Sequence, residues 1–186
     1  MTVRPPHIPC PADVVLALAR VVGTDVSRET IATLERYVGL LAQESPKYNL
    51  IGPREMERIW TRHILDAAQL VPVVQTAMYE DAGAGAHTHA TGVLDVGSGA
   101  GLPGVVLAAF GVAPLTLVEA TQKKCTFLKI VSRETSVPYT VQHCRIEDLK
   151  NVSGRIVVSR AVAAIVQMLD WARPWMRAQH QFAFLK

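Results

Sequence analysis

A glycine-rich segment, Leu94–Gly104, stands between two apolar runs and constrains the fold more than any other part of the chain. Residues 93–96 are expected to form a short buried strand, and residues 101–110 are expected to form a helix. Glycines have no Cβ atom, so the backbone between these elements can turn tightly and approach a ligand closely. A strand, a glycine loop and a helix in this order predict a nucleotide-binding βα unit within a parallel sheet.

The rest of the second half alternates short apolar runs with amphipathic runs of helix length. Further strands are expected at 115–118, 139–144, 156–159 and 181–185, with helices at 122–135 and 164–173. Such alternation builds βαβ units. We therefore predict an α/β fold with a Rossmann-like, doubly wound and mostly parallel sheet over residues 92–186.

The first half of the chain has the pattern of amphipathic helices. Helices are expected at 12–22, at 27–44 and from about 54 to 71. Ser27 is the expected N-cap of the second helix, which Pro46 is expected to break. Pro72 is expected to end or kink the third helix. Together these helices predict an N-terminal helical cap over residues 1–79.

Residues 80–91 are small, polar and rich in glycine, which predicts a flexible loop between the cap and the sheet. His87 and His89 lie in this loop. Two histidines two residues apart could bind a metal, but no cysteine or carboxylate cluster accompanies them. We therefore interpret both as solvent-exposed loop residues and expect no metal site.

Composition excludes several classes of protein. Apolar residues make up 49% of the 186 residues and charged residues 19%, which argues against a disordered chain. No apolar run reaches the roughly 18 residues that a membrane span needs, and the N-terminus lacks a signal-peptide pattern. Cys10, Cys125 and Cys144 are far apart and are interpreted as free thiols, typical of a reducing compartment. We therefore expect a cytoplasmic protein without a membrane segment.

Positive charge is concentrated in the second half of the chain. Residues 1–91 carry 8 Lys and Arg against 10 Asp and Glu, a net charge of −2, whereas residues 92–186 carry 11 against 6, a net of +5. The helix at 122–135 is expected to turn four cations outward: Lys123, Lys124, Lys129 and Arg133. A basic field suits a polyanionic partner such as RNA, although an ordinary solvated surface fits the pattern equally well.

Two kinds of ligand compete for the glycine loop. Dinucleotides usually require the spacing G-x-G-x-x-G, whereas this loop has G-x-G-x-G with Asp95 two residues before the first glycine. That arrangement looks like the first motif of methyltransferases, which bind S-adenosylmethionine. Asp95 could receive the amino group of this cofactor directly or through water, while Gly99 and Gly101 let the backbone pack against the ligand.

Glu119 ends the expected second strand, 22 residues after Gly97. An acidic side chain at that point can accept hydrogen bonds from both hydroxyls of a ribose. This chemistry fits S-adenosylmethionine and NAD equally, so Glu119 predicts a nucleoside ligand without choosing between them.

Two more segments follow strands of the expected sheet. Ile146 and Glu147 come after the third strand, where main-chain groups could contact the adenine edge and Ile146 could pack on its face. Arg160 comes at the carboxyl end of the fourth strand, where it could contact cofactor, base or phosphate. Many enzymes that methylate amines have an Asn/Asp-Pro-Pro-aromatic motif there, and this chain lacks it.

These motifs together resemble the bacterial 16S ribosomal RNA guanine-N7 methyltransferase family, RsmG or GidB, over roughly residues 30 to 186. The matching segments are Leu94–Gly104, Leu117–Glu119 with Gln122–Lys124, Arg145–Glu147, Val158–Ala161, and Tyr48–Leu50 with Arg62–Asp66. The glycine motif is generic to methyltransferases. The Arg-His-Ile-Leu-Asp and Val-Ser-Arg-Ala segments, in this order, are far more specific.

The resemblance implies a class I methyltransferase that uses S-adenosylmethionine to methylate N7 of a guanine in the 530 loop of 16S rRNA. Its substrate would be the small ribosomal subunit or an assembly intermediate, and we expect a monomer. Carried over by position, the cofactor-binding residues are Gly97, Leu102, Ile146, Glu147 and Arg160. The chemistry above adds four more: Asp95, Gly99, Gly101 and Glu119.

The chain departs from the family pattern in two places. The family normally continues through a final strand pair, whereas this chain stops at Lys186, so we expect a core without its last strands. The usual Pro-Gly-Gly turn before the fifth strand is replaced here by Arg177-Ala178-Gln179-His180.

Residues of the Arg62–Asp66 segment leave a role open. His63 lies on the apolar stripe, so a buried, hydrogen-bonded histidine is the default, and the functional alternative is a helix that covers the cofactor pocket or touches RNA. Because guanine N7 carries a lone pair and no proton, we expect no indispensable catalytic acid or base. Two other functions stay open at this point: a small-molecule methyltransferase, and a nucleotide- or NAD-binding module without methyl transfer.

Overall fold

The computed structural model describes residues 4–83, 92–150, 152, 154–160, 165–178 and 180–185. Residues 84–91 lie outside these ranges, so the predicted exposure of His87 and His89 stays a prediction. Ala161 of the family motif and Gln179 of the departing turn also lie outside them.

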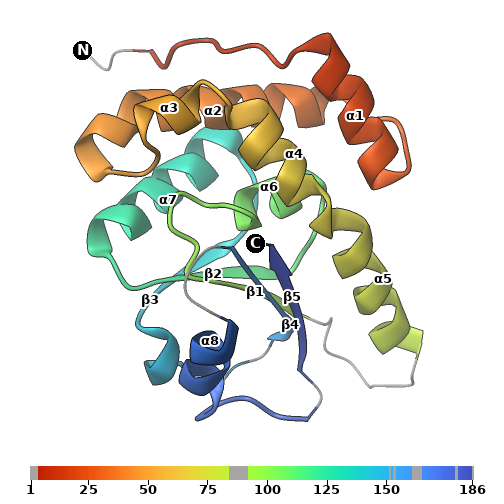
Figure 1. The fold of residues 1–186 in the computed structure, drawn as a ribbon, viewed down its shortest axis with the longest axis vertical. Coiled ribbons are helices and arrows are strands. Elements are labelled where there is room, and N and C mark those ends of the chain that lie inside the picture. Colours follow the sequence, from red (N-terminus) through yellow and green to blue (C-terminus); the bar gives the residue numbers. More distant parts are fainter. Residues whose placement is uncertain are drawn as a thin grey trace.

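A five-stranded parallel sheet in the order β3-β2-β1-β4-β5 forms the centre of the molecule (Figure 1). Its strands are β1 Gly92–Val96, β2 Leu115–Glu119, β3 Thr140–His143, β4 Gly154–Arg160 and β5 Gln181–Leu185. Every pairing is parallel, so the predicted doubly wound α/β fold is confirmed. The chain reverses its direction of winding between β1 and β4, and ligands of such sheets bind beside that switch point.

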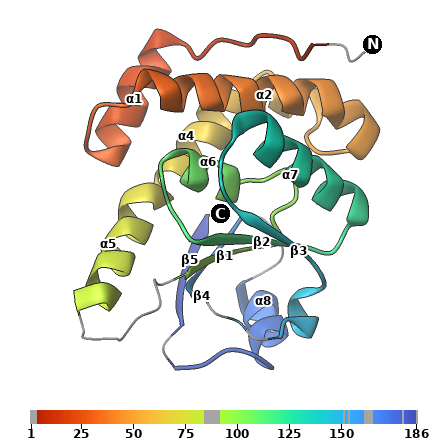
Figure 2. The same ribbon diagram turned by 180° about the vertical axis from the view of Figure 1, so that it is seen from behind.

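Helices cover both faces of the sheet (Figures 1 and 2). On one face lie α6 Gly104–Ala109, α7 Gln122–Thr135 and the N-terminal helices, and on the other lies α8 Ile165–Ala172. Side chains alternate between the two faces along a strand. Val93 therefore joins the large apolar cluster of the first face, while Leu94 joins a smaller cluster with Met168 and Trp175 on the second.

The N-terminal cap consists of α1 Ala12–Val22, α2 Arg28–Tyr48, α3 Pro53–Met56, the π-helix η1 Trp60–Ile64, α4 Leu65–Ala68 and α5 Leu70–Gly83. Ser27 caps α2 as predicted, because its side chain accepts the N–H of Thr30 at 3.1 Å. The predicted break at Pro46 is wrong, since α2 continues to Tyr48. Pro46 lies in the last turn, where its missing N–H removes a single backbone bond and the long apolar face of α2 still packs.

The predicted third helix is also wrong in its continuity. Short α-helical pieces flank the π-turn η1, and a separate helix, α5, starts at Leu70. Pro72 is the third residue of α5, a position where a helix has no partner for a backbone N–H, so α5 continues through it, whereas the preceding helix α4 ends at Ala68, four residues before the proline. As a result α5 extends to Gly83, and residues 80–83 of the predicted loop are helical. The helix predicted at 101–110 is also shorter than expected: α6 begins at Gly104, because residues 99–103 form turns.

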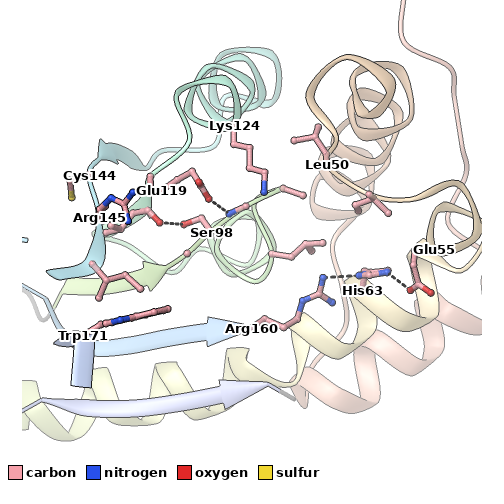
Figure 3. Close-up of a pocket in the computed structure, with 18 of the residues that line it drawn as sticks. Leu50, Glu55, His63, Ser98, Glu119, Lys124, Cys144, Arg145, Arg160 and Trp171 are labelled. Carbon is pink, nitrogen blue, oxygen red and sulfur yellow. Dashed lines mark hydrogen bonds and ion pairs between the residues drawn. The ribbon is translucent and has the colours of Figure 1, made fainter. Parts of the chain in front are cut away.

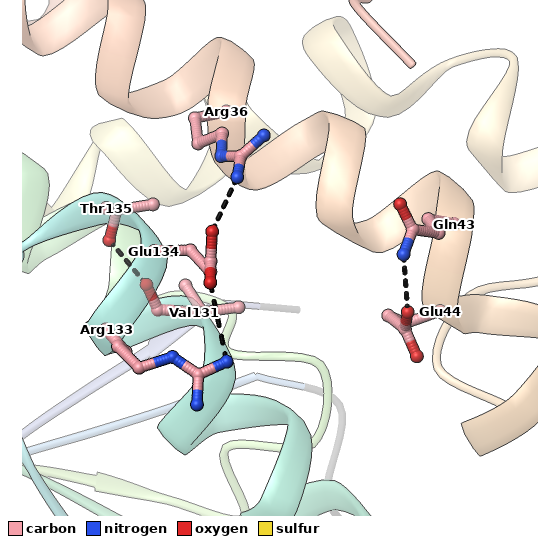
Figure 4. A network of polar contacts seen from close by, with 7 residues as sticks. All are labelled: Arg36, Gln43, Glu44, Val131, Arg133, Glu134 and Thr135. Atoms are coloured by element: carbon pink, nitrogen blue, oxygen red, sulfur yellow. Dashed lines mark hydrogen bonds and ion pairs between the residues drawn. The ribbon is translucent and has the colours of Figure 1, made fainter. Parts of the chain in front are cut away.

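The cap is attached to the sheet through α2 and α7. Buried side chains of both helices belong to one apolar cluster: Leu34, Val38 and Leu41 from α2, and Phe127, Leu128 and Val131 from α7. At the edge of this contact, Nη2 of Arg36 donates to Glu134 at 2.5 Å (Figure 4). A partly exposed ion pair contributes about 0–1 kcal/mol, whereas each buried leucine contributes about 1.5–3 kcal/mol. Apolar burial therefore holds the cap in place.

Candidate functional site

A cavity of about 590 Å³ opens where β1, β2 and β4 end (Figure 3). Its volume falls within the range of small-molecule sites, about 300–1,000 Å³. Its walls come from the glycine loop after β1, the end of β2, the turn after β3 and residues 50–63 of the cap, and one residue each from α7, β4 and α8 completes them: Lys124, Arg160 and Trp171. Of the nine predicted cofactor residues, these line the cavity: Gly97, Gly99, Leu102, Glu119, Ile146, Glu147 and Arg160.

The glycine loop has a backbone that other residues rarely adopt. Gly97, Gly99 and Gly101 have φ angles of +73°, +57° and +100°. The N–H groups of Gly97 and Ser98 both donate to the carbonyl oxygen of Val118, at 2.9 and 3.0 Å. The loop is therefore tied to the end of the neighbouring strand β2, and alternating glycines permit this course because φ > 0 costs them little.

Glu119, the last residue of β2, adds a side-chain contact to the loop. It is 7% exposed, and its Oε2 accepts the N–H of Gly99 at 2.9 Å while its Oε1 accepts the N–H of Thr121 at 2.7 Å. A carboxylate has about four acceptor sites, so each oxygen retains a lone pair for a ligand hydroxyl. Glu119 thus both shapes the loop and presents acceptors to the cavity.

Asp95 and Gly101, the other two predicted cofactor residues, lie behind the loop. Asp95 is fully buried; its Oδ2 accepts the N–H of Gly104 at 3.0 Å, and its Oδ1 has no partner among the described residues. Burial raises the pKa of Asp95 to about 7. A Cβ on Gly101 would lie 2.6 Å from Cγ2 of Val105, so this glycine permits close packing. Direct contact of Asp95 with a ligand is therefore not offered by this geometry, because the carboxylate faces the start of α6.

The turn after β3 contributes both apolar and charged residues to the wall: Cys144, Arg145, Ile146 and Glu147. Ile146–Asp148 is a 3-10 turn, and Nε1 of Trp175 donates to the carbonyl oxygen of Ile146 at 2.7 Å. That carbonyl is thus already engaged, so its predicted contact with an adenine edge is weakened, whereas the Ile146 side chain still faces the cavity. Trp171 of α8 adds an aromatic surface to the same part of the cavity (Figure 3).

Arg160 reaches from the end of β4 to the cap (Figure 3). Its Nη2 lies 2.7 Å from Nδ1 of His63, and the Nε2 of His63 lies 3.0 Å from Oε2 of Glu55. Nη1 of Arg160 also donates to the carbonyl oxygen of Arg62 at 3.4 Å. The His63 side chain is 12% exposed, and its burial together with the Arg160 charge lowers its pKa. His63 is therefore hydrogen-bonded, as the default interpretation predicted, and it also lines the cavity, as the functional alternative predicted.

The four cations predicted on α7 have different surroundings. Lys124 lines the cavity, whereas Lys123 and Lys129 are exposed on the helix surface. Arg133 is exposed too, but its Nη2 lies 3.4 Å from Glu134, which also pairs with Arg36 (Figure 4). Of these four cations, Lys124 alone lines the cavity.

Several contributors to the site were not predicted from the sequence. Trp171, Ile51 and Gly52 line the cavity, and Tyr37 of α2 donates its hydroxyl proton to the carbonyl oxygen of Ala100 at 2.8 Å. Tyr37 is fully buried on a helix whose apolar stripe explains it as a core residue. Only the fold brings it against the glycine loop, 63 residues further along the chain.

No helix in the described part of the chain is long and apolar enough to cross a membrane. Within the same residues, no group of three or more histidine, cysteine or acidic side chains could hold a metal ion. All three cysteines have free thiols.

Comparison with known proteins points to one family. The family described as GidB, rRNA small subunit methyltransferase G, matches residues 30–186. The ribosomal RNA small subunit methyltransferase G of Paramagnetospirillum magneticum is 38% identical over 161 residues, which is 87% of this chain and 73% of the relative. The proteins of the same name from Gluconobacter oxydans and Rhodospirillum rubrum are each 37% identical, over 88% and 87% of this chain and 78% and 74% of their own length.

Proposed function

This chain belongs to the GidB family of rRNA small subunit methyltransferases, and on that basis we propose that it methylates N7 of a guanine in the 530 loop of 16S rRNA. The donor is S-adenosylmethionine. Membership of the family confirms the expected resemblance and the rRNA methyltransferase activity; the base and the atom are our proposal.

The observation that carries the proposal is a cavity built from the glycine loop, the end of β2 and the turn after β3. An ideal Cβ on Gly99 would meet only the carbonyl oxygen of Gly97, at 3.7 Å, so the loop leaves open space above it. Acceptors at Glu119 and an apolar wall at Ile146 provide the polar and flat surfaces that an adenosine needs. The residues present therefore fit the donor.

Each wall suits one part of the donor. Glu119 is suited to accept from the ribose hydroxyls, because both its oxygens face the loop and retain lone pairs. Ile146 and Glu147 are suited to contact the adenine, one through an apolar side chain and one through polar groups. Gly97 and Leu102 belong to the glycine loop between β1 and α6 and complete the wall there, and Arg160 lines the cavity on the side where it contacts the cap.

The proposed chemistry needs no proton transfer. When bound, S-adenosylmethionine supplies an electrophilic methyl group on a positively charged sulfur. Guanine N7 presents an in-plane lone pair without a proton, so the residues of the chain have to orient the base and exclude water. No side chain in the cavity is required as a general base, which agrees with the lack of an Asn/Asp-Pro-Pro motif after β4.

RNA binding is assigned to the surface around the mouth. Lys123, Lys124, Lys129 and Arg133 on α7 are the proposed phosphate contacts, and Lys124 connects this surface with the cavity. A base can reach the cavity only from an unstacked or locally opened segment of RNA.

Two measurements test the proposed function. Calorimetry should detect binding of S-adenosylmethionine and none of NAD. Labelled methyl groups from the donor should appear in 30S subunits and not in free metabolites, and mapping should find 7-methylguanine in the 530 loop. Label at another base would overturn the proposed target, and label in metabolites alone would favour a small-molecule methyltransferase.

A further inference from the structure

The Arg62–Asp66 segment of the cap has no role in the chemistry described above, although two of its residues, Arg62 and His63, contact Arg160. Nδ1 of His63 lies 2.7 Å from Nη2 of Arg160, and Nε2 of His63 lies 3.0 Å from Oε2 of Glu55. The three side chains form a line from the cap to the end of β4 (Figure 3).

The direction of these hydrogen bonds follows from the chemistry of the side chains. A guanidinium has only donors, so Nδ1 of His63 has to accept from Arg160. The single proton of a neutral imidazole is then on Nε2, where it is donated to the Glu55 carboxylate. Glu55 therefore selects the tautomer of His63 that can hold Arg160. A protonated imidazole would carry a proton on Nδ1 and could not accept this bond.

The backbone of the cap explains why His63 can reach this position. His63 lies in the π-helical turn Trp60–Ile64, between two buried residues that anchor it. Single π-turns inside helices redirect a side chain and occur often at functional sites. The same turn brings the carbonyl oxygen of Arg62 to Nη1 of Arg160 at 3.4 Å, so two groups of the cap contact one guanidinium.

We propose that His63 is a positioning residue, which as a neutral imidazole oriented by Glu55 holds the guanidinium of Arg160 at the mouth of the cavity. The inference rests on the proposed function, because it assumes that Arg160 contacts the bound donor. Its consequence is that the cap helps to build the donor site, although the glycine loop and Glu119 belong to the sheet domain.

Several charged groups lie near the imidazole, and the experiment has to distinguish their effects on the pH dependence from that of His63. Glu55 and Asp66 of the cap favour its protonation, whereas burial and Arg160 from β4 oppose it, and the net effect lowers its pKa. Burial raises the pKa of Asp95, beneath the loop, to about 7, so this carboxyl titrates in the same range of pH. A variant that lacks the imidazole but keeps Asp95 shows how much of the pH dependence of donor binding comes from Asp95.

The experiment uses two variants of His63 and one matched control. In His63→Asn the amide oxygen can take the place of Nδ1 and accept from Arg160, whereas His63→Leu has no acceptor. His7→Leu removes another histidine of the cap that pairs with a glutamate, Glu35 at 3.2 Å, away from the cavity. Binding of S-adenosylmethionine is measured by calorimetry at pH 8 and at steps down to pH 5.5, after thermal melts have established folding.

At pH 8 we expect His63→Leu to bind the donor about tenfold more weakly, His63→Asn to recover most of that loss, and His7→Leu to match the wild type. The pKa of His63 is lowered from the ordinary histidine value of about 6.5, so the wild type should lose affinity only as the pH falls well below that value, and His63→Asn should not show this loss. Equal affinities and equal pH profiles for wild type and His63→Leu would overturn the role of His63. If His63→Leu does not fold, the pH profiles of the wild type and His63→Asn test the proposal, and equal profiles for these two would overturn it.

A second readout needs no ligand. Long-range ¹⁵N–¹H NMR of the ligand-free protein at pH 8 should show His63 with a proton on Nε2 and none on Nδ1. The opposite tautomer would overturn the proposal even if the donor binds. Failure of the wild type to bind S-adenosylmethionine, with the expected tautomer present, would instead count against the proposed function.

Discussion

The hydroxyl of Tyr37 donates a 2.8 Å hydrogen bond to the carbonyl oxygen of Ala100, which joins the longest helix of the cap to the middle of the glycine loop. Tyr37 is fully buried, and its hydroxyl would lie 3.2 Å from a Cβ on Gly101. The ligand-binding loop is thus held from both sides, by Glu119 through Gly99 and by Tyr37 through Ala100. The position of the loop depends on the cap as well as on the sheet.

Tyr37→Phe should therefore weaken both the fold and the donor site. The change leaves the carbonyl oxygen of Ala100 without this donor, which costs about 1–3 kcal/mol in a buried setting. Urea unfolding should show that loss, and calorimetry should show weaker binding of S-adenosylmethionine. Tyr139→Phe is the matched control, since its hydroxyl donates to the carbonyl oxygen of Leu128 at 2.7 Å. It should lose stability alone, and an equal loss of donor affinity in both variants would contradict a specific role of Tyr37.

Two glycines of the loop should respond differently to substitution. At Gly99 a side chain has open space toward the cavity, so Gly99→Leu should fold and block the donor. At Gly101 even a methyl group meets Val105 at 2.6 Å, so Gly101→Ala should lower the melting temperature by several degrees.

The control for Gly99→Leu is Gly23→Leu. Gly23 also has a positive φ, +78°, and its Cβ would meet nothing within 4 Å, but it ends α1 away from the cavity. Both leucines pay about 1–2 kcal/mol for the left-handed backbone. Retained binding of S-adenosylmethionine by Gly99→Leu, measured by calorimetry, would show that the donor does not occupy the proposed cavity.

The sequence predicted the elements of the sheet because each depends on local pattern. Strand 181–185 and helix 122–135 have the predicted bounds, since apolar periodicity and turn residues define them. Prediction failed where a local rule was overridden by context. Pro46 lies in the last turn of α2, where it removes a single backbone bond, and Pro72 lies in the first turn of α5, where a proline is tolerated.

Only those residues of the site that belong to recognisable sequence motifs could be predicted. The glycine loop, Glu119 and Ile146 follow strands, so their meeting at one edge of the sheet follows from parallel topology. Tyr37, His63 and Trp171 come from helices that pack over this edge, and no spacing in the sequence indicates which side of the cavity they face. Asp95 was placed at the correct strand end, but the structure turns its carboxylate toward Gly104.

The buried carboxyl of Asp95 should make stability depend on pH. Its pKa is about 7 in the folded protein and about 3.9 in an unfolded chain, so between these values the folded state binds a proton that the unfolded state has lost. This contribution is fully present below about pH 4 and is lost as the pH rises toward 7. Asp95→Asn keeps an acceptor for the N–H of Gly104 and does not titrate. Urea unfolding from pH 4.5 to 8 should find a steeper decline in the wild type, and parallel curves would contradict the raised pKa.

The exposed lysines of α7 give the last prediction, because they separate RNA binding from donor binding. Lys123 and Lys129 do not line the cavity, so Lys123→Gln with Lys129→Gln should leave the affinity for S-adenosylmethionine unchanged. Each lost phosphate contact should reduce the slope of log affinity against log salt by about 0.7 on single-stranded RNA, about 1.4 for both. Filter binding to a 530-loop fragment at several salt concentrations measures this slope. Arg28→Gln is the control, since Arg28 is exposed at the start of α2, which spans about 30 Å and ends beside the cavity. If this control lowers the slope as much as the double variant does, the RNA surface is not centred on α7.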